Sequence, residues 1–585
     1  VLVQGLRRVR FDELTDEEPY FRARVTTFDD AGTDAIAVTN GHHWTSDAHQ
    51  VTSIDWSIGQ VGLGSSPDNW NDTELVAYFL GLACIDRDNE WWFDNASNTV
   101  YYRAPGGVDP STLTGTLRAR NVDHAITIEN SQGIVIHGLD FFSAALAVKD
   151  SAPDVRVDGC RFRYPSTNKL VLGVLDWPSY DGYEPPAGNT VGLVLDGDDG
   201  EFTSNVVEWS NVHLNFAADG VLVENNVFCG IEWDVVSGAG SGSINIGPRG
   251  RFRRNRVAWG GNSEGVRALY GSDDVEIDYN HVSQMSTLQH DGAAINVSQF
   301  AERSHVHHNW VHDNEKLAIR WDWWDAGTRT HGGVFHHNVT WGIEPWQIKN
   351  DHSLLYSNVG AGDSYVWLYQ WDGGYNDGTL QVNNLSSNIM VDADEQRDNG
   401  DCGEYHHNHV ANGSELDLLV DAGQFDFRPM ASSAALVDQG ARIPTSEIVG
   451  LSTYDLPVPL DGNYVDLPYQ GSAPDIGAYE LGSDVYWMPG PQLVSASFPI
   501  PADGATGQPL DRDLIFLIGY GGVSADVYLG TSPGSLSRVQ GNVAAPNNVV
   551  DPGTLTSGTT YYWRVDTVLA DGSVVEGVLW QFATT

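Results

Sequence analysis

Apolar and polar residues alternate in short runs through the middle of the chain, and most of these runs end at an asparagine. Val275, Ile277 and Tyr279 form one such run before Asn280, with the period of two that is typical of a half-buried strand. The phrase returns every 20 to 30 residues, at Asn225, Asn255, Asn280, Asn309, Asn338, Asn358, Asn388 and Asn408. A unit of this length cannot bury its apolar face alone, so the repeat predicts a solenoid of stacked coils.

The coils are expected to consist of strands rather than helices. No unit has ten or more residues with a period of 3.6, and Gly, Asn, Val and aromatic residues dominate them. The predicted fold is all-β, a right-handed parallel β-helix. Each asparagine is expected at a bend, because Asn tolerates left-handed backbone, and its amide is expected to bond the asparagine of the next coil. Gly138 and Gly159 are expected to take this place in two earlier turns.

The asparagine phrase is confined to the middle of the chain, which divides the protein into three parts. Residues 1–125 lack the phrase and are interpreted as a β-rich segment that caps the open end of the solenoid. Residues 126–487 are the β-helix with its C-terminal cap, followed by a Pro- and Gly-rich linker. Residues 492–585 contain alternating runs that predict a β-sandwich, with Trp563 and Trp580 in its core.

The net charge of the chain indicates which kinds of molecule it is not expected to bind. Its 585 residues include 31 basic and 78 acidic side chains, a formal net charge of -47, which argues against nucleic acid. A hydrophobic content of 41% argues against general disorder. No run approaches the roughly 20 apolar residues of a membrane span. We expect a secreted protein, extracellular or periplasmic, whose signal peptide has been removed.

The strand that follows each asparagine turn is where reactive side chains are expected. Aligning these strands by their apolar residues places Ile295, Ile319, Ile348 and Leu368 inward. Because side chains alternate across a strand, the outward face then carries two columns on coils about 4.8 Å apart. The first column is Asn296, Arg320, Lys349 and Tyr369, and the second is Ser298, Asp322, Asp351 and Trp371. Cations, carboxylates and aromatic rings gathered on one wall are unlike a plain solvated face.

A wall of this composition suits the hydrolysis of a glycosidic bond. The reaction needs one carboxyl group to protonate the leaving oxygen and one carboxylate to activate water or attack the sugar. Asp322 and Asp351 are the predicted pair, with Asp291 as a third candidate. The predicted substrate-binding side chains are Arg320, Lys349, His290, His352, Asn296, Tyr369, Trp321, Trp323, Trp324 and Trp371. A cluster of five arginines between Arg249 and Arg256 favours an anionic polysaccharide as the substrate.

Two other functions fit the same wall. In a polysaccharide lyase that acts by β-elimination on a uronic acid polymer, Arg320 would neutralise the substrate carboxylate, Lys349 would take the proton and Tyr369 would supply one. In a carbohydrate-binding β-helix without catalysis, the polar columns would only be solvated or contact sugar. The hydrolase requires no cofactor, whereas calcium could bind at Asp322 and Asp351 in the lyase.

Histidines are frequent between His305 and His337, but no metal site is expected among them. Most of them flank the asparagine of successive coils, so stacking of imidazoles at a turn accounts for their spacing. The four cysteines have no CxxC spacing, which argues against a zinc cluster.

Several segments resemble secreted bacterial β-helix carbohydrate enzymes. They are Glu90–Asp94 and Val100–Pro105 before the coils, Ile134–Phe141 in the first coil and Pro474–Ala478 in the cap. Among those enzymes, the chain is most similar to the glycoside hydrolases that include fucosidases, xylanases and fucanases. The last part resembles fibronectin type III or immunoglobulin-like modules. The resemblance covers about residues 85–480 and implies the architecture and a polysaccharide substrate. The arginine cluster favours a sulfated, fucan-like marine polymer, with the offsetting of local acidic surface as the alternative. The resemblance carries over no catalytic residue, because the matching segments are structural.

Overall fold

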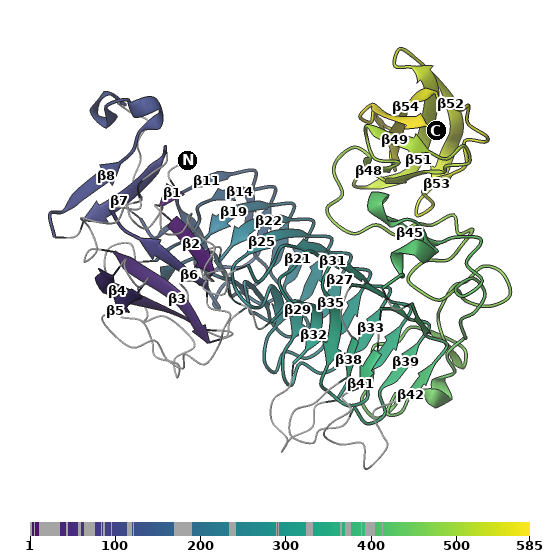
Figure 1. The fold of residues 1–585 in the computed structure, drawn as a ribbon, viewed down its shortest axis with the longest axis horizontal. Coiled ribbons are helices and arrows are strands. Elements are labelled where there is room, and N and C mark those ends of the chain that lie inside the picture. The colour runs from purple at the N-terminus through teal and green to yellow at the C-terminus, as the bar shows by residue number, and fades with distance from the viewer. Residues whose placement is uncertain are drawn as a thin grey trace.

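Three long parallel sheets form the wall of a solenoid in the computed structural model of the chain (Figure 1). The predicted parallel β-helix is therefore confirmed. The structure describes residues 122–168, 190–232, 242–287, 289, 292–322, 331–362, 366–368, 376–387, 389–391, 404–411 and 413–585. Before residue 122 it describes 3–4, 6–10, 35–42, 45–55, 60–63, 76–82, 85, 88–94, 96–113 and 120. These described residues contain no helix that is long and apolar enough to cross a membrane.

The sheets are numbered here in the order in which a coil visits them. Sheet 1 contains β10 (Val135–His137), β13 (Arg156–Asp158), β18 (Glu201–Thr203), β21 (Leu222–Glu224), β24 (Arg251–Arg253), β27 (Glu276–Asp278), β30 (His305–His307), β33 (Val334–His336), β36 (Leu354–Tyr356), β39 (Leu380–Val382) and β42 (Glu404–His406). Sheet 2 contains β11 (Asp140–Phe142), β14 (Arg161–Arg163), β19 (Val206–Ser210), β22 (Val227–Ile231), β25 (Arg256–Gly260), β28 (His281–Ser283), β31 (Trp310–His312), β34 (Val339–Trp341), β37 (Val359–Ala361), β40 (Leu385–Ser386) and β43 (His409–Val410). Sheet 3 contains β9 (His124–Ile128), β12 (Ala145–Val148), β17 (Val194–Leu195), β20 (Leu214–Phe216), β23 (Ile244–Ile246), β26 (Val266–Ala268), β29 (Ala293–Val297), β32 (Leu317–Trp321), β35 (Glu344–Ile348), β38 (Val366–Leu368) and β41 (Ile389–Val391).

A ladder of asparagine amides runs through the turn between sheets 1 and 2. In each coil the asparagine Oδ1 accepts the backbone N–H of the equivalent residue one coil earlier, as Asn309 does from Asn280 at 2.9 Å. Asn309 Nδ2 donates to the carbonyl of Ile277, also at 2.9 Å. The ladder consists of Asn205, Asn226, Asn255, Asn280, Asn309, Asn338, Asn358, Asn384 and Asn408. The predicted bonding between asparagines of neighbouring coils is confirmed.

The bend itself is made by the residue before each ladder asparagine, which corrects the sequence-based prediction. Nine such residues have φ between +51° and +63°: Ser204, Asn225, Arg254, Tyr279, His308, His337, Ser357, Asn383 and His407. Gly138 and Gly159, with φ of +67° and +61°, occupy this left-handed position and not the ladder position. Asn225 was accordingly misassigned, because the ladder member of its phrase is Asn226. Asn384 continues the ladder where Asn388 was expected, and Asn388 lies outside the described residues.

Sheets 1 and 2 are covered on their outer faces near the C-terminal end of the solenoid. Val334, Leu354 and Tyr356 of sheet 1 pack against Ile443 and Leu456 of the cap in one buried cluster. On sheet 2, Trp310 is fully buried against cap residues and donates from Nε1 to Tyr479 Oη at 3.0 Å. The cap contains η7 (Leu416–Leu418), β44 (Leu419–Asp421), η8 (Ala422–Gln424), β45 (Asp426–Pro429), η9 (Thr445–Glu447), β46 (Leu460–Asp461) and β47 (Tyr464–Val465).

The predicted C-terminal sandwich is present and is joined to the cap. Its strands are β48 (Ser497–Ile500), β49 (Ala505–Gln508), β50 (Leu514–Leu517), β51 (Gly522–Ser532), β52 (Ser535–Ala544), β53 (Val549–Val550), β54 (Thr560–Leu569), β55 (Val574–Val575) and β56 (Trp580–Thr584), in two sheets. Trp563 and Trp580 are buried in its core, as predicted. The expected linker lies against the coils, since the Gly490 N–H donates to the Tyr279 carbonyl at 2.8 Å.

At the opposite end of the solenoid, short sheets precede the first coil (Figure 1). One contains β1 (Val3–Gln4), β7 (Glu90–Asp94) and β8 (Thr99–Tyr102), and the other contains β2 (Leu6–Arg10), β3 (Ile36–His42), β4 (Thr45–Asp55), β5 (Gln60–Leu63) and β6 (Val76–Leu80). The helical turns η3 (Pro105–Gly107) and η4 (Pro110–Thr112) follow them, and β15 (Thr167–Asn168) pairs with β16 (Thr190–Val191) beside the coils. The ends of the solenoid thus carry additional β-structure, while the coils between them carry the repeat.

The ladder predicts a large loss of stability when one of its members is removed. Asn309→Ala deletes the acceptor of the buried Asn280 N–H, so the free energy of unfolding should fall by about 2 to 4 kcal/mol. Asn463→Ala is the control, because Asn463 is exposed in a cap turn and should change stability by less than about 0.5 kcal/mol. Urea unfolding followed by fluorescence measures both, and equal stabilities of the two variants would contradict the role of the ladder.

Candidate functional site

The outward column of sheet 3 has the predicted register between β29 and β32, but a different register between β32 and β35. Asn296 pairs with Arg320, which confirms that these two residues are neighbours in one column. The next partner of Arg320 is Gln347 and not Lys349, because Trp321 pairs with Ile348. The sequence alignment of Ile348 with Ile319 was therefore wrong by two residues. Such a slip leaves the inward and outward faces unchanged, but it moves Lys349 one column along, next to Asp322.

The corrected register builds an ion-pair group around Asp322. Lys349 Nζ lies 2.8 Å from Asp322 Oδ1, and Arg320 Nη2 lies 3.1 Å from Asp322 Oδ2. Arg320 Nε also donates to Asn296 Oδ1 at 3.0 Å. The side chains of Arg320 and Lys349 are 5% and 8% exposed, whereas that of Asp322 is 25% exposed. The carboxylate is thus the accessible member of the group, and the two cations lie below it.

A second carboxylate joins the group from an earlier coil. Glu264 Oε1 lies 3.2 Å from Arg320 Nη2, and Glu264 Oε2 lies 3.0 Å from Arg267 Nε. One nitrogen atom, Arg320 Nη2, therefore contacts both Glu264 and Asp322. We call Glu264, Arg267, Arg320, Asp322 and Lys349 the wall cluster.

The sequence alignment missed Glu264 because this residue stands before β26 and not within it. Asn262 positions it, since Asn262 Oδ1 accepts the Glu264 backbone N–H at 3.1 Å and Asn262 Nδ2 donates to the fully buried Glu232 at 2.6 Å. His213 lies 3.9 Å from Glu232, and burial lowers the pKa of His213 to about 4, so its imidazole is neutral at pH 7. The Asn-Ser-Glu-Gly turn before a strand was the available signal for this carboxylate.

The wall cluster controls the ionisation of Asp322. Burial alone would raise the pKa of this carboxyl group, but the charges of Arg320 and Lys349 outweigh burial and hold the pKa well below its usual value. Asp322 is therefore ionised at neutral and at mildly acidic pH. An ionised, partly exposed carboxylate can accept a proton from water or attack an electrophilic carbon.

Three other predicted site residues lie elsewhere. Asp351 is 1% exposed, accepts the Asp377 N–H at 3.0 Å and forms a bridge with His331, so it belongs to a bend and not to the column of Asp322. The His352 ring stacks on Tyr454 of the cap with centroids 4.8 Å apart. Trp321 is fully buried and packs on Phe335, so its ring faces the core and not a sugar.

The remaining predicted residues are outside the part of the chain that the structure describes. They are Asp291, His290, Trp323, Trp324, Tyr369 and Trp371. The segments that contain them adjoin the strands of sheet 3 in sequence. Their assignment as catalytic or substrate-binding residues stays a prediction.

The arginines between Arg249 and Arg256 are not part of the wall cluster. Arg251 and Arg253 lie in β24 of sheet 1, where they pair with Glu276 at 3.1 Å and with Asp278 at 3.2 Å. Arg249 pairs with Asp219. Arg249, Arg251 and Arg253 thus offset acidic neighbours.

The side-chain groups that could hold a metal ion, within the described segments, lie on sheet 1 and not at the wall cluster. Asp322 and Asp351, which the sequence suggested as calcium ligands, are not both in the wall cluster. The two carboxylates that share a partner there, Glu264 and Asp322, are already neutralised by three cations. The wall cluster therefore suits acid–base or electrostatic chemistry carried out by its own side chains.

Comparison with known proteins places few limits on the function. No family model matches the sequence, and no curated protein matches it. One solved structure, described as "Glycoside hydrolase", is 11% identical over 70% of this chain and 77% of that chain, with a TM-score of 0.32. No inference about activity rests on a likeness of this size.

Proposed function

We propose that the protein is a glycoside hydrolase that cleaves an anionic polysaccharide bound along the outer face of sheet 3. The observation that carries the proposal is the contact of two carboxylates, Glu264 and Asp322, with the same nitrogen of Arg320 at 3.2 and 3.1 Å. Two oxygens that contact one nitrogen can be no farther apart than the two contact distances added together, which favours the separation of about 5 to 5.5 Å of retaining glycosidases over the longer one of inverting enzymes. A polymer substrate makes secretion part of the same proposal.

The two carboxylates have different roles in this scheme. Asp322, whose pKa is held low by Arg320 and Lys349, is the ionised group that activates water or attacks the anomeric carbon. Glu264 is the second carboxyl group of the scheme. It is ion-paired with Arg267 and Arg320, so it has to take up a proton before it can deliver one to the leaving oxygen. Arg320 contacts both and keeps them in register, so its role is positioning.

The charge of the wall cluster favours an anionic substrate. Arg267, Arg320 and Lys349 supply three positive charges against the two negative charges of Glu264 and Asp322. The cluster is thus locally cationic on a chain whose net charge is -47. Arg320 and Lys349 are buried below Asp322, so they act on a bound anion through their charge, and Arg267, whose side chain is 17% exposed, is the most accessible of the three cations. This charge suits a sulfated or uronic acid polymer, including a fucan-like one.

A lyase is the second candidate, because the same cations could neutralise a uronate. In that reaction Lys349 would remove a proton, yet its Nζ already donates to Asp322 at 2.8 Å. An ammonium engaged in this way has no lone pair to offer as a base. The contact favours hydrolysis over elimination.

A panel of neutral, sulfated and uronic acid polysaccharides tests the reaction class. We expect new reducing ends without the absorbance of an unsaturated sugar, and the largest rates on an anionic polymer. Unsaturated products would replace the hydrolase with the lyase. Binding of polymer without either product would leave a carbohydrate-binding protein.

Removal of either carboxylate should abolish the reaction. Asp322→Asn and Glu264→Gln should each lower kcat by about 100-fold or more on the best substrate of the panel, because each loses a proton-transfer or nucleophilic group. Glu208→Gln is the matched control, since Glu208 pairs with Arg161 at 2.7 Å on sheet 2, and its kcat should stay within about twofold of the parent. Parent-like rates in both test variants would refute the assignment.

The charge of Lys349 should affect the pH below which kcat/KM declines. Lys349→Met removes one of the three charges, with those of Arg320 and Arg267, that lower the pKa of Asp322, so this carboxylate becomes protonated at a higher pH. In a profile from about pH 3 to 8, kcat/KM of the parent should show no acidic limb from Asp322, whereas the limb of the variant should enter the acidic end of this range. Urea unfolding at pH 7 controls for folding, and the absence of this limb from a folded variant would contradict the role of Asp322.

A further inference from the structure

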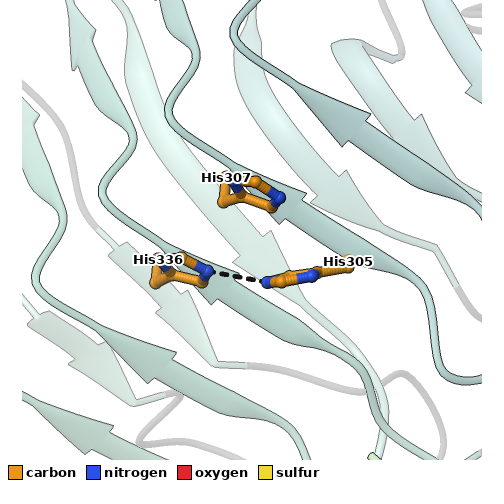
Figure 2. A group of neighbouring side chains, drawn as sticks. All are labelled: His305, His307 and His336. Atoms are coloured by element: carbon orange, nitrogen blue, oxygen red, sulfur yellow. Dashed lines mark hydrogen bonds between the residues drawn. The ribbon is translucent and has the colours of Figure 1, made fainter. Parts of the chain in front are cut away.

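Sheet 1 carries a group of histidines on the same coils as the wall cluster, but on another face of the solenoid. His307 of β30 pairs with His336 of β33, and their rings stack with centroids 4.8 Å apart and an interplanar angle of 5°. His305 stands two residues before His307 on the same strand face. Figure 2 shows the three imidazoles converging, with the contact between His305 and His336 marked. Adjacent coils thus bring three imidazoles to one point.

The contact between His305 and His336 is a nitrogen-to-nitrogen one. Their Nε2 atoms are 2.7 Å apart, a distance that admits one proton between them and not two. At least one of these nitrogens therefore presents a lone pair to the other. A lone pair on a neutral imidazole nitrogen is what a transition-metal ion binds.

The Nδ1 atoms of His336 and His307 already have partners. His336 Nδ1 lies 2.7 Å from His337 Nδ1, and His307 Nδ1 lies 2.8 Å from His308 Nδ1. His337 and His308 are the left-handed residues of the turn, so the asparagine ladder fixes their positions. Ligand histidines usually have their second nitrogen bonded in this way, which orients the ring and leaves Nε2 for the metal.

An oxygen ligand stands beside the imidazoles. Glu276 pairs with His305 in the strand register, and its Oε1 lies 3.3 Å from His307 Nε2. One ligand atom from each of His305, His307 and His336 lies within 4.8 Å of the others, and Glu276 forms a second such group with Asp278 and His307. A tetrahedral ion about 2.0 to 2.1 Å from each nitrogen spaces its ligands by about 3.3 Å. Binding therefore requires the parallel rings of His307 and His336 to rotate toward the ion and the Glu276 carboxylate to turn toward it.

We propose that His305, His307 and His336 bind one divalent transition-metal ion such as zinc, with Glu276 supplying an oxygen ligand. The ion would join strands β27, β30 and β33, which belong to three successive coils. Three imidazoles and a carboxylate complete a four-coordinate site, so the role of the ion is to stabilise the coil stack and not to activate water. The prediction from the sequence that these histidines only stack is replaced by this proposal, which is independent of the hydrolase.

Zinc titration of the full-length protein tests the site. The protein carries no polyhistidine tag, is stripped with a chelator and is titrated with zinc by calorimetry. We expect one ion per chain with a Kd in the micromolar range or tighter, and a higher unfolding temperature with zinc present. Cobalt in place of zinc should give the visible absorption bands of tetrahedral coordination. Absence of stoichiometric binding would overturn the proposal.

Variants assign the binding to these side chains. His336→Gln and His305→Gln should each weaken zinc binding by at least tenfold and remove the cobalt bands. His305→Gln is included because His305 is only partly buried, so this variant is expected to fold even if His336→Gln does not. His406→Gln is the matched control. His406 lies in β42 of the same sheet and contacts His407 at 3.0 Å in the same turn, but it pairs with Val382 and not with a histidine. Parent-like binding in a folded His305→Gln variant, or equal loss in His406→Gln, would refute the site.

Discussion

The bonding of each coil to the next is the constraint on which the rest of this structure depends. Backbone pairing within the three sheets sets the spacing of the coils, and the asparagine ladder fixes the turn between sheets 1 and 2. A buried amide that accepts from the previous coil and donates to its carbonyl cannot shift by one residue without leaving polar groups unpaired. Residues far apart in sequence, such as Glu264, Asp322 and Lys349, thereby become neighbours.

The cap covers the outer faces of two of the three sheets. Cap residues bury the outer faces of sheets 1 and 2 at their C-terminal ends, and the cap is itself tied to the sandwich by Arg512 and Asp426 at 3.2 Å. Both of these side chains are almost completely buried, so this ion pair is less screened by solvent than a surface one. On sheet 3, the outward side chains of Asn296, Arg320 and Lys349 are buried as well, and Asp322, whose side chain is 25% exposed, is the accessible member of the wall cluster. A polymer would therefore meet this face at Asp322.

The fold was predictable from the sequence because a period of 20 to 30 residues with alternating strands has one common solution. The register of sheet 3 was not, because the coils differ in length and apolar residues such as Ile319, Trp321, Trp346 and Ile348 all face the core. Matching Ile to Ile ignored that Trp321 also points inward. A slip of two residues keeps every side chain on its face, so alternation could not reveal the error.

The site was predictable in part, and the missing part has a physical reason. Asn296, Arg320 and Asp322 lie in or beside the expected column because the pairing of β29 with β32 followed the alignment. Glu264 was missed because it lies in the turn before β26, and the alternation of residues within strands says nothing about turn residues. Its side chain is long enough to contact Arg267 and Arg320 from this turn.

The two polar groups of the solenoid lie on opposite sides of one shared core. The histidines of β30 and β33 alternate with Val306 and Phe335, which pack in the same buried cluster as Ile295, Ile319 and Ile348 behind the wall cluster. Close packing of this core limits how far one sheet can shift without the others. An ion that ties β27, β30 and β33 together would act on the coils that also carry Arg320 and Asp322, because β30 and β32 belong to the same coil.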